Sequence, residues 1–329
     1  MSLIKRFLLI FTLCLSYFAN AQKNDYKAYS HYLILSDITS NLDSSIFYIE
    51  KAINVAEPFA EDFRQLSFLY FKKGNVKKAK KAFFSAVNAG YQLEKDDKFN
   101  DKAFKLDYDS SYLNTADKTK FGMFVQDLWN SRKKAIRKLR DNYLKRNLKT
   151  DDEIFEAMLQ NENYFQSLRF MFYDNKVNDS VAFPYIAKYG PSPNSYYMLD
   201  LLKSDLFPHR RNCARFNGLT ITMLLNHGVS GFLNKQDAEE FITILWNLVI
   251  RGDLKPREYA AAYDQYVQFF IQPDKNMLGT TRYRDEEGNS RIMDLIDPGH
   301  VNEIRKKYWL DSIQNYCEQY NVKLPKNYE

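Results

Sequence analysis

Large and small apolar residues alternate in a fixed order between residues 63 and 86, and this order constrains the fold of the chain more than any other feature. Large side chains at spacings of three and four predict helices, and Gly74 separates the two halves of the segment. Small residues let two helices approach closely, while large ones fill the gap to the next pair. The segment is therefore predicted to form a helical hairpin. Its defining positions are Phe63, Leu66, Ser67, Tyr70, Gly74, Ala79, Phe83 and Ala86.

A weaker copy of this pattern precedes it. Shifting the pattern upstream by about 34 residues again places large and small residues in register, and this copy ends near Pro58. The two segments resemble tetratricopeptide repeats, which are helical hairpins of this period. The resemblance implies a stack of hairpins that offers a groove for a partner and little chemistry of its own. The upstream positions are Tyr29, Tyr32, Leu33, Ile49 and Ala52.

A polar connector and a basic helix are expected after the repeats. Residues 94–117 are rich in Asp, which favours a solvated linker or a degenerate third unit, since the acids lack the spacing of a calcium-binding loop. One helix is then expected at residues 120–148, with Phe121, Val125 and Leu128 on its apolar side. Its other sides carry many basic residues, which could bind an acidic surface or lipid headgroups or simply face solvent. These are Arg132, Lys133, Lys134, Arg137, Lys138, Arg140, Lys145 and Arg146.

Two amphipathic helices are expected in the carboxyl-terminal half. Apolar residues recur at spacings of three and four from Gln236 to Val249, and Gly252 suits the left-handed cap that ends such a helix. A second helix should begin at Pro256, because proline is tolerated in a first turn, and should end before Pro273. Residues 151–172 also have a helical pattern.

A β-hairpin is expected near residues 278–296, where two short segments rich in β-branched and aromatic residues flank a turn-forming run. A last helix should start near Pro298 and run through Ile313. The predicted fold is therefore mostly α. Tetratricopeptide-like helical hairpins and a connector (residues 22–117) precede a helical domain (residues 118–329) that carries one β-hairpin.

Polar residues that a packed core does not require recur in this second domain. His227 stands where an apolar segment stops, Asp264 lies on the second helix, Thr280 opens the hairpin, and Arg305 lies on the last helix. A base, an orienting acid, a hydroxyl and a cation are the groups that a hydrolase brings together. Each also has an ordinary interpretation, as a helix cap, a solvated acid, a strand residue or a structural ion-pair partner. Tyr259, Thr281 and Arg282 lie beside these positions and are the expected binding residues.

The same positions resemble an uncharacterised bacterial domain family, a domain of unknown function. Its pattern of a helix-end His, a Tyr-Ala helix with an Asp, a Gly-Thr at a strand start and an Arg in the closing helix spans about residues 120–320. The family's Gln corresponds to Thr281, and this departure removes an amide group from the site. The resemblance implies no established activity. Matching positions are His227, Tyr259, Ala260, Asp264, Gly279, Thr280, Arg305 and Leu310, with a further match at Asn161, Glu162, Tyr164 and Arg169.

The first 21 residues have the pattern of a secretory signal peptide. Lys5 and Arg6 precede a short apolar run, and Ala-Asn-Ala then offers a cleavage site before Gln22. The run is shorter than the about 20 apolar residues that cross a bilayer, although an uncleaved anchor is the alternative. We therefore expect an exported protein, periplasmic or extracellular, that is not an integral membrane protein after cleavage.

The charge and the cysteine content bear on three properties: nucleic-acid binding, disulfide formation and metal binding. Cleavage removes two basic residues and no acid, so the formal charge falls from +6 to +4, which argues against nucleic acid as a partner. Cys213 and Cys317 remain. They could form one disulfide, which would close a loop of about 100 residues and stabilise the fold by about 4–5 kcal/mol, or stay as two buried thiols. No Cys-x-x-Cys, His-Glu-x-x-His or close His pair occurs, so neither a metal nor a cofactor is expected.

Two functions are consistent with these features. The first is a secreted or periplasmic binding protein that uses its repeats to hold another polypeptide or an envelope component. The alternative is a hydrolase-like enzyme in which His227 is the general base and Asp264 orients it. In this enzyme, Thr280 or Thr281 is the nucleophile or a hydrogen-bonding partner of the substrate, and Arg305 or Arg282 pairs with an anionic group. The reaction, substrate, partner and oligomeric state do not follow from the residues.

Overall fold

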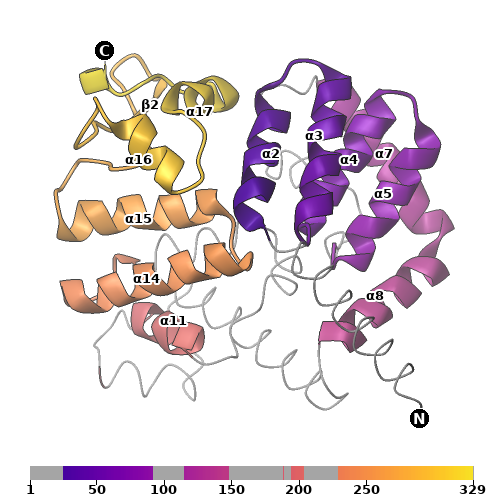
Figure 1. Cartoon of the computed structure of the whole chain (residues 1–329), viewed down its shortest axis with the longest axis horizontal. Coiled ribbons are helices and arrows are strands. Elements are labelled where there is room, and N and C mark those ends of the chain that lie inside the picture. Colours follow the sequence, from indigo (N-terminus) through magenta and orange to yellow (C-terminus); the bar gives the residue numbers. More distant parts are fainter. Residues whose placement is uncertain (1–24, 92–114, 148–187, 189–193, 204–228, 329) are drawn as a thin grey trace, which may run out of the picture.

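A computed structural model describes residues 25–91, 115–147, 188, 194–203 and 229–328. Over these residues the protein is mostly helical and has one two-stranded antiparallel sheet, which confirms the predicted fold class (Figure 1). The predicted signal peptide and the helical pattern at residues 151–172 lie outside the described residues. Within the described ranges, every helix is too short or too polar to cross a bilayer.

The amino-terminal part is a stack of helical hairpins (Figure 1). Each hairpin packs on the next, through α3 against α4 and then through α4 and α5 against α7 and α8. The helices are α2 (Tyr26–Ile38), α3 (Leu42–Val55), α4 (Ala60–Lys72), α5 (Val76–Asn88), α7 (Thr115–Ser131) and α8 (Lys133–Asn147).

Three residues of the repeat pattern, Ser67, Ala79 and Phe83, lie in the core of the stack. Ser67 and Ala79 are fully buried where α4 meets α5, and the Ser67 hydroxyl donates a 2.8 Å hydrogen bond to the Ala79 carbonyl. Phe83 is fully buried, and its ring meets those of Tyr91 and Trp129. Polar residues begin these helices, as when the Asn75 side chain accepts a hydrogen bond from Lys78 N.

The expectation of one helix at residues 120–148 is wrong, because the chain turns at Arg132 and forms two helices. The first places Phe121 and Val125 against α4, and the second places Ile136 against α5, so both pack in the same core as the hairpins. One straight helix could not reach both neighbours, and Arg132 and Lys133 offer no apolar side chain whose burial would oppose the turn. The core of the stack thus continues past residue 117.

The carboxyl-terminal part begins with helices that the sequence locates well. Helix α14 ends at Gly252, which takes the left-handed conformation with φ of 78°, and α15 has Pro256 in its first turn. The elements are α11 (Asn194–Lys203), α14 (Lys235–Arg251), α15 (Pro256–Phe270), β1 (Arg282–Arg284), β2 (Ser290–Ile292), α16 (Val301–Lys307), α17 (Ile313–Tyr320) and the 3-10 helix η1 (Lys326–Tyr328).

The hairpin forms as predicted, but the last helix does not. Strand β1 pairs with β2 in register Tyr283 to Arg291, and a turn stabilised by the Asp285 carboxylate joins them. The single helix expected from Pro298 through Ile313 is instead α16 and α17, separated by a reversal at Trp309, whose φ is 57°. The break occurs where the Arg305 side chain bonds Leu278 and Asp311.

Helices α14 and α17 lie beside α2, so the carboxyl-terminal part covers one end of the stack (Figure 1). Gly252 allows the close approach, because a Cβ added there would lie 2.2 Å from the Tyr26 ring. Trp309 packs against the cluster that contains Tyr26 and Tyr29. The unusual backbone at Gly252 and Trp309 is therefore found where the two parts meet.

Charged residues join the two parts beside these apolar contacts. The Lys255 ammonium lies 3.5 Å from the Asp62 carboxylate and 3.8 Å from Glu61, and the Arg257 guanidinium lies 3.7 Å from Asp37. Burial raises the pKa of Asp37, and the nearby Arg257 offsets part of that shift. The amino-terminal cap and first turn of α15 thus hold the carboxyl-terminal part on the stack.

Candidate functional site

Asp264 is the centre of the candidate site, and its carboxylate is fully buried on the inner face of α15. It accepts four hydrogen bonds from the loop that precedes β1: from the amides of Met277 (2.9 Å), Leu278 (2.7 Å) and Thr280 (2.7 Å), and from the Thr280 hydroxyl (2.6 Å). Burial raises the pKa of this carboxyl, and the four donors offset part of that shift. All the polar atoms of Asp264 are therefore engaged by the chain itself.

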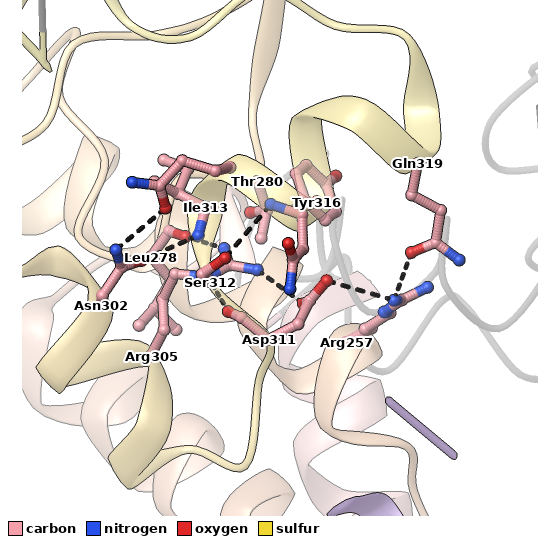
Figure 2. A network of polar contacts seen from close by, with 12 residues as sticks. Arg257, Leu278, Thr280, Asn302, Arg305, Asp311, Ser312, Ile313, Tyr316 and Gln319 are labelled. Carbon is pink, nitrogen blue, oxygen red and sulfur yellow. Dashed lines mark hydrogen bonds and ion pairs between the residues drawn. The ribbon is translucent and has the colours of Figure 1, made fainter. Parts of the chain in front are cut away.

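Arg305 binds the same loop from the opposite side. Its guanidinium is 1% exposed and donates to the Leu278 carbonyl, to the Asp311 carbonyl (2.6 Å) and to the Asp311 carboxylate (3.0 Å), as Figure 2 shows. It also lies over the Tyr316 ring, with the guanidinium carbon 5.1 Å from the ring centroid. Since one side chain holds Leu278 and Asp311 together, it explains why α16 stops and the chain reverses before α17.

Asp311 extends this network toward the stack. Its carboxylate is buried between two cations, with Arg305 at 3.0 Å and Arg257 at 3.7 Å (Figure 2). Arg257 also donates to Gln319 (2.6 Å) and Tyr320 (2.7 Å), and reaches Asp37 of α2. One continuous network of polar contacts thus connects the loop before β1, helices α16 and α17, and α2 of the stack.

The predicted catalytic residues are brought together in part. Asp264 and Thr280 are in direct contact, and Arg305 binds the carbonyl of Leu278 in the same loop. His227, the expected general base, lies outside the described residues. The Asp264 and Arg305 side chains bond the backbone of residues 277–280, and the Thr280 hydroxyl donates to the Asp264 carboxylate, so all three have a structural role in this loop.

The predicted binding residues lie around this loop without sharing one surface. Tyr259 is buried in an aromatic cluster, with its ring centroid 5.1 Å from that of Trp246 and 5.4 Å from that of Tyr308. Arg282 lies over the Tyr320 ring and donates to the Tyr316 hydroxyl (2.9 Å). The Thr281 carbonyl accepts from the amide of Met293 in the hairpin and from the Asn276 side chain.

Two further sequence predictions concern the cysteines and a metal site. Cys317 is a buried free thiol, and burial raises its pKa to about 11. Cys213 lies outside the described residues. In the part of the chain that the structure describes, no group of three His, Cys, Asp or Glu side chains is arranged to hold a metal ion.

Asp311, Arg257 and Asn276 are the important polar residues that sequence reasoning missed. Asn276 is fully buried and accepts from Gln268 (2.8 Å) while it donates to the Thr281 carbonyl (3.1 Å). A signal existed for Asp311, because an acid between Leu310 and Ile313 interrupts the apolar side of the expected last helix. Nothing in the local sequence marks Arg257 or Asn276.

Comparisons with known proteins find no matching family model, no matching curated protein and no matching solved structure. The chemistry of the site therefore has to be judged from its own geometry.

Proposed function

We propose that this chain is an exported bacterial binding protein, periplasmic or extracellular, which uses its stack of helical hairpins to hold a partner in the cell envelope. One observation carries the choice between binding and catalysis. The buried carboxylate of Asp264 and the buried guanidinium of Arg305 bond the backbone of the chain itself, together with the Thr280 hydroxyl and the Asp311 carboxylate. A hydrolase would need such groups directed at a substrate.

The stack supports the proposal through its exposed side chains. Met123 on α7 is 62% exposed and Phe47 on α3 is 49% exposed, and the Lys51 ammonium lies 4.6 Å from the centre of the Phe47 ring. Large apolar side chains on stacked hairpins are typical contact residues for a partner. The carboxyl-terminal part covers one end of the stack at α2, which leaves α3 to α8 as the proposed binding region.

Photo-crosslinking in intact cells tests the binding function. A photoreactive amino acid replaces Phe47 or Met123, and Phe269, which is 54% exposed on α15, is the matched control. We expect a discrete adduct with an envelope component from the two stack positions, suppressed by excess unmodified protein. No adduct, or the same adduct from position 269, would contradict the proposal.

Fractionation and terminal sequencing test the exported location. The mature protein should begin at Gln22 and should be released with the periplasm or the medium. Full-length protein in the cytoplasm would contradict export without bearing on whether the stack binds a partner.

A further inference from the structure

Positive charge is concentrated in two segments of the stack. Residues 72–91 contain six Lys and no acid, and residues 132–147 contain eight basic residues and one acid, Asp141. Since the whole chain has 47 basic and 41 acidic residues, the remainder has 33 basic residues against 40 acidic ones. The small net charge of the whole chain is therefore the sum of a strongly basic pair of segments and an acidic remainder.

The fold brings these two segments together, because α5 packs against α8. Each helix buries one side in the stack, through Ala79 and Phe83 on α5 and through Ile136 on α8. Residues four apart lie on one side of a helix, so Lys77 and Lys81 face away from the core on α5, as do Lys134 and Lys138 on α8. We call the outward sides of α5 and α8 the basic face. It lies at the end of the stack away from the carboxyl-terminal part (Figure 1).

Acidic side chains among the described residues leave most of the charge on the basic face without an ion-pair partner. Lys73 pairs with Asp43 and Lys78 lies 4.0 Å from Glu50, both toward α3. Seven other cations of this face are exposed and form no ion pair among the described residues. They are Lys77, Lys80, Lys81, Lys133, Lys134, Arg137 and Lys138. Like charges kept at this density oppose folding, so a negative partner would relieve an existing repulsion.

We propose that the basic face binds the surface of a bilayer that contains anionic phospholipids; this rests on the proposed binding function and names the envelope component that the stack holds. The charges extend over two helices without an ordered alternation of sign, which matches a uniformly negative surface better than a protein partner with charges of both signs. Lysine predominates, and its ammonium acts as a point charge without the fixed fork that selects single phosphates.

Single-stranded nucleic acid fits the basic face less well. Proteins that bind it combine positive charge with exposed aromatic side chains on which bases stack. On α5, Phe83 is buried and Phe84 is partly buried, and the residues of α8 whose side chains are described include no aromatic residue. Over its described residues, the basic face thus has the charge for a lipid surface and no exposed aromatic side chain on which bases could stack.

Vesicle sedimentation with the full chain tests the proposal. We compare phosphatidylcholine vesicles with vesicles in which about a third of the lipid is phosphatidylglycerol. The test variant replaces four lysines of the basic face by Gln, and the matched control replaces four exposed lysines elsewhere. The test positions are Lys77, Lys81, Lys134 and Lys138, and the control positions are Lys27, Lys306, Lys307 and Lys326.

We expect binding only to the anionic vesicles and a steep loss of binding as NaCl rises. Because each basic residue near such a surface adds to the attraction, the test variant should bind more than about tenfold more weakly, while the control binds like the wild type. Equal weakening of both variants, or no binding to anionic vesicles, overturns the proposal. Tighter binding to single-stranded DNA than to the vesicles, lost in the same variant, overturns the lipid assignment as well. Each of these outcomes is independent of an adduct at position 47 or 123, so failure here is distinguishable from failure of the binding function.

Discussion

The stack and the carboxyl-terminal part differ in the buried polar side chains that bond their backbones. In the stack, most buried polar residues are serines, and Ser67 bonds Ala79 and Ser36 bonds Ser45 on the neighbouring helix. The buried charged residues there, Asp62 and Arg64, lie near the start of α4. In the carboxyl-terminal part, buried charged residues such as Asp264 and Arg305 hold loops that have no regular secondary structure.

The difference follows from where backbone hydrogen bonds are made. A helix satisfies its own amides and carbonyls, so a stack of helices needs only apolar and small residues between them. Loops buried beside α15 have amides with no such partners, and a buried unsatisfied group is costly. A spaced set of polar residues is therefore what a buried loop requires, even though the same set resembles a catalytic site.

Asp264→Ala is expected to have the largest effect, because it leaves the buried amides of Met277, Leu278 and Thr280 without their acceptor. Losses of about 1–3 kcal/mol for each such group, partly relieved by relaxation, predict a fall of about 3–5 kcal/mol in the free energy of unfolding. Urea denaturation followed by circular dichroism measures it. The matched change in the stack, Ser67→Ala, removes one hydrogen bond and should cost about 1 kcal/mol.

Comparable losses for these two variants would contradict the distinction between the two parts. Asp264→Asn sharpens the test, because the amide keeps one acceptor oxygen for the loop but loses the second. Its stability should lie between those of the wild type and Asp264→Ala.

Gly252→Ala tests the contact between the two parts and should have the next largest effect. An alanine Cβ would lie 2.2 Å from the Tyr26 ring, and the backbone φ of 78° is strained for any residue with a Cβ. We expect a loss of about 2–4 kcal/mol in the free energy of unfolding. Gly288→Ala is the control, because φ is 80° there but nothing lies within 4 Å of the added Cβ.

The control should lose only about 1 kcal/mol, which is the strain without the clash. If Gly252→Ala were no worse than Gly288→Ala, α2 would not be packed on α14 in solution. The double variant Gly252→Ala with Tyr26→Ala should recover part of the loss, because it removes the ring that the new methyl group meets.

Regular helices were predictable from the sequence because their signals are local. The spacing of apolar residues from Ala238 to Val249, the glycine at 252 and the proline at 256 fix α14 and the start of α15 within a residue or two. The reversal at Trp309 was not predictable, because it depends on Arg305 reaching both Leu278 and Asp311, and the first of these is distant in the sequence. Long-range contacts of this kind have no periodicity.

The candidate site was predictable as a set of residues but not as a structure. Asp264, Thr280 and Arg305 stand out because polar side chains interrupt apolar positions, and they do converge. Whether such groups face a ligand or the chain's own backbone depends on the path of residues 276–281, which no local pattern specifies. Asp311 and Arg257 complete the network from elements whose meeting also depends on tertiary packing.

The smallest expected effect is at Glu258, whose titration makes the stability of the contact between the two parts depend on pH. It accepts a hydrogen bond from Lys255 N (3.1 Å), beside Asp62 of the stack, and burial raises its pKa to about 7, with Lys255 offsetting part of the shift. The unfolded chain loses this proton near its ordinary pKa of 4.5, and the folded protein keeps it until about 7. The folded state therefore binds more protons between these values, and stability falls as the pH rises through that window.

Glu258→Gln removes this titration and keeps an acceptor for Lys255 N. The difference in unfolding free energy between pH 5 and pH 7.5 should shrink by about 1–2 kcal/mol, less than the full shift implies because the side chain is partly exposed. Glu287→Gln is the control, because the hydrogen bond from Lys323 lowers the pKa of Glu287 below its ordinary value of 4.5. Its contribution to stability is lost only below about pH 5, so the difference between pH 5 and pH 7.5 should remain that of the wild type. An unchanged pH dependence in Glu258→Gln would mean that water reaches this carboxylate and that the two parts of the molecule separate there.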